Sequence, residues 1–179
     1  MKKHLLSFLL VASLLLGALV APAAESPEVA KATRVKVGQS APQFEVTQLD
    51  GKQFSLKEQR GKVVVVNFFA TWCGPCVAEM PHLESQIWQK KKDKKFAFIS
   101  IGREHSTDEL KPFRAKHKLT FPMAGDPKRE VYGLYAEAYI PRTLLIDGEG
   151  RIVRQVVGYE EEEFKALLKS IDDELAKLK

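Results

Sequence analysis

Cys73 and Cys76 are the only two cysteines in the chain, and two residues separate them. A disulfide between them would close a very short loop, and the stabilisation that a disulfide gives grows with loop length. The pair is therefore poorly suited to hold a fold together and well suited to reversible oxidation and reduction. A stapling disulfide, common in proteins outside the cytoplasm, is the alternative use.

The position of the cysteines suits thiolate chemistry. The preceding run Val63–Phe69 is rich in β-branched and aromatic residues, which predicts a central strand buried on both faces. A helix is expected to begin at the cysteines and to extend to about Lys91. Unpaired N–H groups and the helix dipole stabilise an anion at such a helix start, and the thiolate is the attacking species. We expect Cys73 to be the exposed nucleophile and Cys76, one turn further in, to be the shielded resolving cysteine.

Metal binding is the main alternative use of a close cysteine pair, and it needs more ligands than these two. His82 is the nearest candidate, but it lies six residues beyond Cys76, with Pro81 between them. A haem attachment motif requires His directly after the second cysteine, where this chain has Val77. We therefore expect no metal, and no cofactor apart from the redox-active disulfide.

The first residues resemble a targeting segment. Lys2 and Lys3 precede the apolar run Leu5–Val20, and Ala21-Pro22-Ala23 supplies small residues for cleavage. This pattern predicts a signal peptide over 1–23. An uncleaved anchor is the alternative, since the run is only slightly shorter than the ~20 residues that span a bilayer. Either way the domain is expected outside the cytoplasm, in the bacterial periplasm or cell envelope.

The remaining pattern predicts one α/β domain over 35–179, preceded by a flexible linker over 24–34. Two hairpins are expected, around Asp50-Gly51 and Asp147-Gly148. A strand is expected over 96–101 and a short helix over 108–117. The final helix has an apolar face with helical spacing, formed by Phe164, Leu167, Leu168, Ile171, Leu175 and Leu178.

Charge gives little indication of a partner, because the formal net charge is only +5. The lysine-rich run 90–95 contains no aromatic residues. It is expected to be a solvated helix end and loop rather than a nucleic-acid patch. His105 and His117, in or beside a predicted helix, are expected at the surface.

The longer motifs resemble the TlpA/ResA-like thiol–disulfide oxidoreductases of the thioredoxin superfamily. They are Ala41-Pro42-Gln43-Phe44, Leu49-Asp50-Gly51-Lys52, Arg60-Gly61-Lys62, Asn67-Phe68-Phe69-Ala70-Thr71-Trp72-Cys73-Gly74-Pro75-Cys76, Glu79-Met80-Pro81, Ile140-Pro141-Arg142-Thr143 and Ile146-Asp147-Gly148. The resemblance implies a thioredoxin-like fold, with a central mixed β-sheet flanked by helices. It also implies an N-terminal β-hairpin and a strand-helix insertion between Cys76 and Pro141.

The resemblance also implies roles for residues around the cysteines. Pro81 matches the proline that kinks the active-site helix, and Pro141 matches a cis-proline that faces the disulfide. Only about one X–Pro bond in twenty is cis, so the cis form is expected from the resemblance alone. Trp72, Ile140 and Pro141 are the expected substrate-binding residues, although Trp72 could equally serve in packing. Structural roles at the site are expected for Gly74, Pro75, Pro81 and Asn67.

Glu79 is the third expected catalytic residue, because the related proteins have a Glu here that handles protons near the disulfide. It follows Cys76 by three residues and shares its helical face. An ordinary surface acid stabilised by the helix dipole is the alternative. Asn67 stands where plain thioredoxins have a buried Asp, and an Asn cannot take up that proton.

The expected activity is reduction of disulfides in other exported proteins. Gly74 and Pro75 add no positive charge near Cys73, and strong oxidants need extra stabilisation of the reduced thiolate. By resemblance, maturation of c-type cytochromes is the expected task, with an apocytochrome as substrate and a membrane thiol conduit as electron donor. The chain is expected to be a monomer that does not bind nucleic acid.

Three other functions remain as alternatives. A disulfide oxidase or isomerase would use the same cysteines at a higher potential. A peroxiredoxin would have Thr or Ser in place of Ala70 and Pro in place of Val66, so antioxidant activity is not expected. A metal-delivery module would need a further ligand.

Overall fold

The computed structural model describes residues 26–92 and 94–178. The predicted signal peptide, 1–23, and the first two residues of the predicted linker lie outside this part of the chain. None of the helices in the described ranges is long and apolar enough to cross a membrane.

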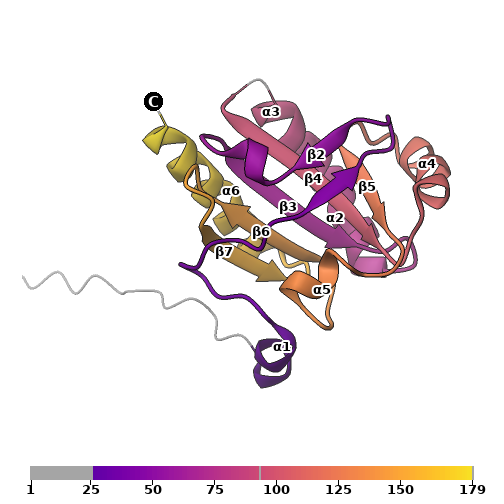
Figure 1. Cartoon of the computed structure of the whole chain (residues 1–179), viewed down its shortest axis with the longest axis horizontal. Helices are drawn as coiled ribbons and strands as arrows, with labels where there is room; N and C mark the ends of the chain where they lie inside the picture. The colour runs from indigo at the N-terminus through magenta and orange to yellow at the C-terminus, as the bar shows by residue number, and fades with distance from the viewer. Residues whose placement is uncertain (1–25, 93, 179) are drawn as a thin grey trace, which may run out of the picture.

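A five-stranded mixed sheet forms the centre of the molecule (Figure 1). Its strands, in the order β5-β4-β3-β6-β7, are Met123–Asp126, Phe96–Arg103, Val63–Phe69, Arg142–Ile146 and Ile152–Val157. β3 pairs in parallel with β4, and β4 with β5, whereas β6 runs antiparallel to β3 and β7. Every residue of β3 is buried, which confirms the predicted central strand.

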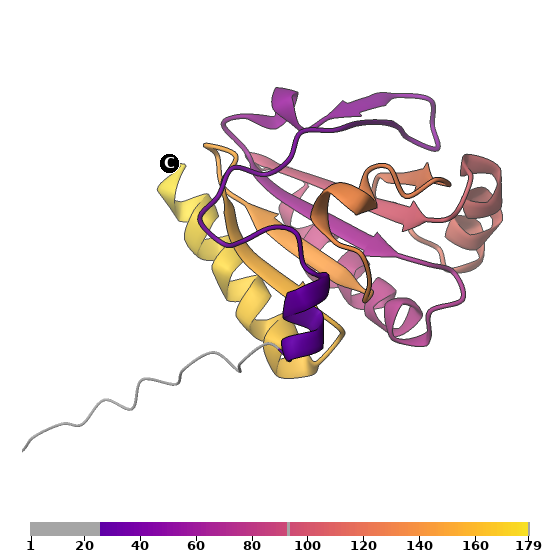
Figure 2. The ribbon, with the colours of Figure 1, turned by 60° about the horizontal axis from the view of Figure 1, so that its bottom comes forward.

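Alternate residues of β3 face two separate hydrophobic cores. Val63, Val65 and Phe69 pack with apolar residues of helices α2 (Gly74–His82), α4 (Thr107–Lys116) and α6 (Glu161–Lys177). On the other face, Val64, Val66 and Phe68 pack with the hairpin β1–β2 (Glu45–Thr47 and Gln53–Ser55) and the short helix α5 (Tyr132–Tyr135). Figure 2 shows the two layers, with α6 on one side of the sheet and α5 on the other. This arrangement confirms the thioredoxin-like α/β fold with an N-terminal hairpin.

The active-site helix is not uniform along its length. After α2, the chain continues as a π-helical segment, Leu83–Trp88, and as the short α3, Gln89–Lys91. Pro81 lies in the last turn of α2 and cannot donate a backbone hydrogen bond to the preceding turn. The helix predicted from the cysteines to Lys91 is therefore present, with a widened turn after its proline.

A single-turn 3₁₀ helix, Lys57–Gln59, follows β2.

β5 and α5 were not among the elements expected from residue patterns. They lie between α4 and β6, within the segment where the resemblance implies an inserted strand and helix. β5 has only four residues and includes Gly125, so it carries little strand signal of its own. Its pairing with β4 is what defines it as a strand.

The stretch expected as a flexible linker is partly helical. α1, Pro27–Ala32, is capped by Ser26, whose hydroxyl accepts a hydrogen bond from Val29 N–H. Thr33 then forms a β-bridge with Ala136, and Arg34 N–H donates to the carbonyl of Tyr135 at 2.9 Å. Local capping and these backbone bonds therefore attach the end of this stretch to the domain.

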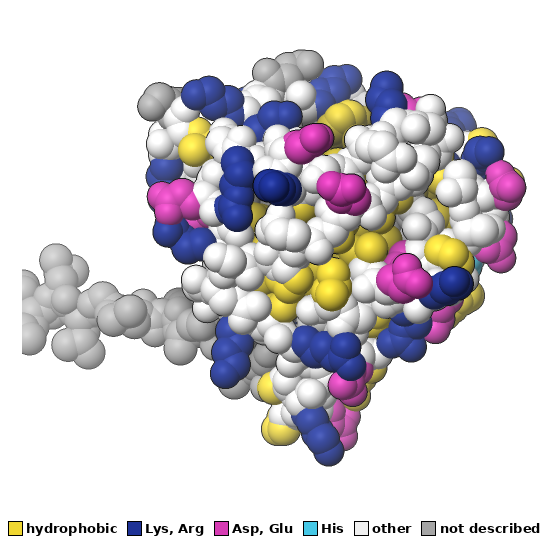
Figure 3. All heavy atoms as spheres, viewed as in Figure 1, with side chains coloured by type: hydrophobic (Ala, Val, Ile, Leu, Met, Phe, Trp, Pro, Cys, Tyr) yellow, Lys and Arg dark blue, Asp and Glu magenta, His cyan; other side chains and the backbone are white. Residues whose placement is uncertain are grey.

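The lysine-rich run also differs from expectation at one position. Lys91 is buried against α6, where its ammonium group pairs with Asp172. The neighbouring Lys90 and Lys92 are exposed, as expected for a solvated helix end. Figure 3 shows basic and acidic side chains interspersed around an apolar centre on the face in view.

Candidate active site

Cys73 and Cys76 form a disulfide at the start of α2, with 5.3 Å between their Cα atoms. Cys73 is the N-cap residue of the helix, and the backbone N–H of Cys76 points at Cys73 Sγ from 3.3 Å. An N-cap position faces the positive end of the helix dipole. When the pair is reduced, this N–H group and the dipole stabilise negative charge on the sulfur of Cys73.

The two cysteines differ in burial less than expected. Cys76 is fully buried, as predicted, but Cys73 is only 7% exposed rather than openly exposed. Cys73 Sγ lies 3.8 Å from the carbonyl oxygen of Ile140, so the neighbouring loop covers part of the sulfur. Cys73 is still the more accessible of the two.

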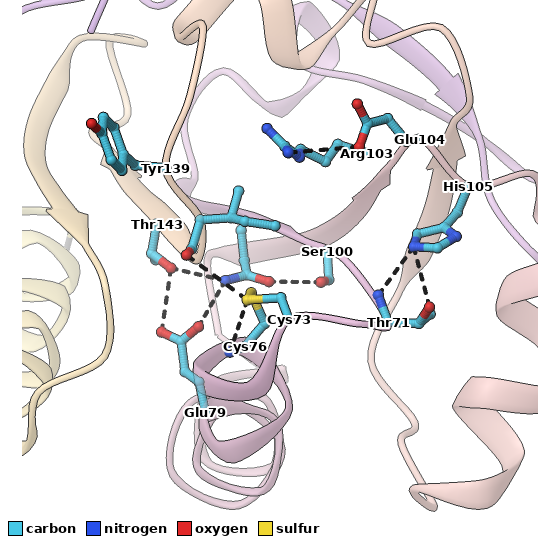
Figure 4. The surroundings of a disulfide bond; sticks show 12 residues. Thr71, Cys73, Cys76, Glu79, Ser100, Arg103, Glu104, His105, Tyr139 and Thr143 are labelled. Atoms are coloured by element: carbon cyan, nitrogen blue, oxygen red, sulfur yellow. Dashed lines mark hydrogen bonds and ion pairs between the residues drawn. A yellow bond between two sulfur atoms is a disulfide. The ribbon is translucent and has the colours of Figure 1, made fainter. Parts of the chain in front are cut away.

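The loop facing the disulfide contains the expected cis bond, between Ile140 and Pro141. Figure 4 shows this loop beside Cys73, with Tyr139 at its outer end. Trp72, directly before Cys73, is 62% exposed, so its aromatic side chain faces solvent. The guanidinium of Arg103 lies over the Trp72 ring, 5.6 Å from its centroid. Trp72 is thus at the protein surface rather than in a core.

Glycine and proline shape the first turn of the helix. A Cβ atom added at Gly74 would meet no other atom within 4 Å, so the space beside this turn is open. Pro75 lies in the first turn, where the backbone nitrogen has no intrahelical acceptor. The two residues between the cysteines therefore leave the Cys73 side of the helix uncrowded and uncharged.

A buried hydrogen-bond network lies beneath the disulfide (Figure 4). Asn67 on β3 donates from Nδ2 to Glu79 Oε2 at 3.1 Å and to Thr143 Oγ1 at 2.9 Å. The hydroxyl of Thr143 donates in turn to Glu79 Oε1 at 3.5 Å. Ser100 Oγ donates to Asn67 Oδ1 at 2.8 Å. Residues of β3 and β6 thus bond directly to the carboxyl group on α2, and β4 joins the network through Asn67.

Glu79 is not a surface acid, because its side chain lies in this network and the residue is only 2% exposed. Burial disfavours the charged carboxylate and raises the pKa of Glu79 to about 8, against the opposing effect of hydrogen bonds from Asn67 and Thr143. The group can therefore hold a proton at neutral pH. A buried acid of this kind beside a thiol pair is typical of a site tuned for proton transfer.

Sequence reasoning did not identify three residues that the fold brings to this region. Ser100 and Thr143 complete the network around Asn67, from strands far away in the chain. His105 was expected at the surface, but it is buried and its ring contacts Thr71, two residues before Cys73. The available signals were the small polar residues Ser100 and Thr143 within largely apolar strands, and the place of Thr143 in one of the resemblance motifs.

Within residues 26–92 and 94–178, no group of three or more His, Cys, Asp or Glu side chains is arranged to hold a metal ion. Val66 and Ala70, where a peroxiredoxin would have Pro and a hydroxyl residue, are both fully buried. The Cys73–Cys76 pair is the redox-active group of this site, and the buried carboxyl group of Glu79 lies beneath it (Figure 4).

Comparison with known proteins agrees with this chemistry. Residues 37–155 match the model of the AhpC/TSA family. The thiol-disulfide oxidoreductase ResA of Bacillus thuringiensis (strain Al Hakam) is 34% identical over 96% of this chain and 99% of its own. ResA of Bacillus subtilis (strain 168) is 31% identical over 69% of each chain.

Solved structures show the same relationship. A putative protein disulfide isomerase from Bacteroides thetaiotaomicron has a TM-score of 0.78 and 40% identity, covering 81% of this chain and 93% of its own. A putative thiol:disulfide interchange protein DsbE from Chlorobium tepidum has a TM-score of 0.68 and 30% identity, covering 79% and 99%.

Proposed function

The chain belongs to the AhpC/TSA family and is a ResA-like thiol–disulfide oxidoreductase, and from this premise we propose that it reduces disulfides in other exported proteins. The observation that carries the proposal is the position of Cys73 as N-cap of α2, with the N–H of Cys76 directed at its sulfur. A sulfur in this position loses its proton readily when the pair is reduced, and the resulting thiolate is the attacking species.

The proposed reaction is a two-step exchange. The Cys73 thiolate attacks one sulfur of a substrate disulfide, forms a mixed disulfide and releases the other substrate sulfur as a thiolate. Cys76 then loses its proton and attacks Cys73 Sγ, which releases the second substrate thiolate. The substrate gains two electrons, and its two thiolates take up two protons, one equivalent to that lost by Cys76 and one from solvent. The protein is left with the Cys73–Cys76 disulfide.

Glu79 has the proposed role of proton acceptor when Cys76 becomes a thiolate. It lies on the same helix, three residues further along, and burial raises its pKa to about 8. Near neutral pH a fraction of this group is ionised, and that carboxylate is basic enough to take a thiol proton. Asn67 and Thr143 hold it in place without titrating themselves.

The substrate segment is proposed to lie extended beside Ile140 and Pro141. The carbonyl of Ile140 is next to Cys73 Sγ, where it can accept a backbone hydrogen bond from the segment that carries the target cysteine. Trp72 offers an exposed aromatic surface at the same place. The open space beside Gly74 leaves room for this approach.

The proposed setting is the bacterial periplasm or cell envelope, after cleavage of residues 1–23 or with residues 5–20 as an anchor. The proposed substrates include apocytochrome c, whose cysteine pair must be reduced before haem attachment. A membrane thiol-reducing conduit is the proposed electron donor, and the proposed active form is a monomer.

The direction of exchange is tested by the redox potential. Gly74 and Pro75 add no charge that would stabilise the reduced thiolate, so a potential near the thioredoxin value of about −270 mV is expected. Equilibration with glutathione buffers and gel-shift analysis of the thiols measures it. A Gly74→Lys variant, in which a cation lies beside Cys73, should shift the potential upward and serves as the matched control. A value above about −180 mV would instead assign the protein to disulfide oxidation or isomerisation.

A further inference from the structure

The ring of His105, between β4 and α4, points at the turn that precedes Cys73 (Figure 4). His105 Nε2 lies 3.0 Å from the backbone nitrogen of Thr71 and 3.3 Å from Thr71 Oγ1. A backbone N–H can only donate, so Nε2 must carry a lone pair. The geometry therefore requires the neutral ring with its proton on Nδ1.

The backbone around His105 is held by contacts with β5 and by the start of α4. Glu104 has a left-handed backbone conformation, with φ of 65°, and its N–H donates to the carbonyl of Asp126 on β5 at 2.8 Å. Gly125 lies so close that a Cβ there would be 2.5 Å from the carbonyl oxygen of His105. A capping box between Ser106 and Glu109 then starts α4. The ring is thus directed at Thr71 by the inserted strand β5 and by the start of α4.

The turn that receives this contact leads directly to the reactive sulfur. Cys73 N–H donates to the carbonyl of Ala70 at 3.2 Å, which closes a turn with Thr71 and Trp72 at its corner. The N–H of Thr71 lies just beyond the end of β3, and His105 is its acceptor. The imidazole therefore fixes the orientation of the peptide that leads from the strand to the N-cap residue Cys73.

We propose that neutral His105 is a positioning residue that holds the Thr71–Trp72 turn so that Cys73 stays at the N-cap of α2. The inference rests on the proposed function, because it assigns His105 to the nucleophile of that exchange reaction. A second proton on the ring turns Nε2 into a donor that faces the N–H of Thr71, so the hydrogen bond is lost and the turn moves. Cys73 is then less well placed at the helix start.

Other charged groups also lie near His105. They are Arg103 and Glu104 at the end of β4, Glu109 in the first turn of α4 and Asp126 at the end of β5. Among these, Glu109 interacts electrostatically with His105, and hydrogen bonds from Ser106 are the main reason that its pKa is lowered. Glu79 titrates beneath the disulfide. The variants compared below keep all these groups. The ratio of their alkylation rates therefore removes the contribution of these groups to the rate.

The test compares three proteins that share the Cys76→Ser change, so that only Cys73 reacts with iodoacetamide. The first keeps His105. His105→Gln places an amide oxygen near the position of Nε2 and accepts the bond at every pH. His105→Phe keeps a ring but cannot accept. Because one hydrogen bond contributes about 1 kcal/mol, its loss is expected to change the alkylation rate about five-fold.

The expected ratio of the His105 rate to the Gln rate is about one, because both side chains can accept the bond from the N–H of Thr71. The ratio of the Phe rate to the Gln rate is expected to stay near one fifth throughout. A His105 rate well below the Gln rate would overturn the proposal. A Phe variant equal to the Gln variant would do so as well.

A nuclear magnetic resonance measurement keeps the test independent of reactivity and of folding failure in the variants. In the unmodified chain, the ¹⁵N shift of Nε2 should identify an unprotonated nitrogen at pH 8, and the Thr71 amide should shift as that nitrogen gains a proton. A protonated Nε2 at pH 8, or a Thr71 amide that ignores the ring, would refute the inference. If Cys73 is unreactive in every variant while these signals are as expected, the proposed exchange function fails and the positioning contact stands.

Discussion

The side-chain amide of Asn67 on β3 donates a hydrogen bond to the carboxyl group of Glu79 on α2, with 3.1 Å between Nδ2 and Oε2. Both residues are buried. An aspartate at position 67 would place a second acid beside Glu79, and two buried carboxyl groups at this distance cannot both ionise easily. With asparagine there, the network beneath the disulfide contains one titratable carboxyl group, Glu79.

The stability of the folded protein should depend on the protonation of Glu79. Its pKa is raised to about 8 in the folded state, whereas an unfolded Glu titrates near ~4.3. Between these values the folded state holds a proton that the unfolded state has released. The free energy of unfolding should therefore decrease as the pH rises through this window, by up to about 1.4 kcal/mol per pH unit.

Glu79→Gln removes this titration, so its unfolding free energy should change less between pH 5 and pH 8.5 than that of the unmodified chain. Urea unfolding of the oxidised proteins measures both. Glu162→Gln is the matched control, because the Glu162 side chain is 86% exposed and lies far along the chain in α6. Parallel stability curves for the unmodified chain and Glu79→Gln would contradict the assignment of a raised pKa.

The pH dependence of the disulfide-exchange rate should also depend on Glu79. Glu79→Gln keeps a polar group that can bond to Asn67 and Thr143, but it cannot accept the proton of Cys76. Its rate of disulfide exchange should vary less than that of the unmodified chain between roughly pH 5 and 8, where a tuned acid and a thiol titrate. Stopped-flow reduction of a model peptide disulfide provides the measurement. Identical pH profiles would remove Glu79 from the proton-transfer step.

Cys73 should be an acidic thiol. The N–H of Cys76 and the start of α2 stabilise its thiolate, so a pKa of roughly 6 to 7.5 is expected, as in other Cys-x-x-Cys sites. The rate of iodoacetamide alkylation against pH in Cys76→Ser measures it. Cys76 in the matched Cys73→Ser variant should titrate higher, because it is fully buried. An apparent pKa near about 8.5 for Cys73, the value of an ordinary thiol, would count against the nucleophile assignment.

Removal of the resolving cysteine should trap substrates. With Cys76→Ser the reaction stops at the mixed disulfide, because no second sulfur can attack Cys73. Expressed with its own N-terminal segment, this variant should accumulate adducts that dissolve in reductant, and mass spectrometry should identify exported proteins with cysteine pairs. Cys73→Ser should give few or none. The same adducts from both variants would show that Cys73 is not the attacking residue.

The sequence alone determined the elements whose signal is local. The apolar run 63–69 predicted a strand buried on both faces, and the spacing from Phe164 to Leu178 predicted the final helix. The pair Cys73 and Cys76 at a strand–helix junction indicated its own chemistry, because the effect of a helix start on a thiolate depends only on residues within one turn. Family resemblance added the cis bond before Pro141.

Only the tertiary structure decided which distant residues surround this pair. Ser100 and Thr143 reach Asn67 because β4 and β6 flank β3 in the sheet, and no local pattern encodes that pairing. His105 looked like a surface residue, yet β5 holds its backbone so that the ring meets Thr71. Glu79 illustrates both what the sequence determines and what the tertiary structure adds. Its place on the helix face of Cys76 follows from spacing, whereas its raised pKa arises from burial beneath strands that only folding brings together.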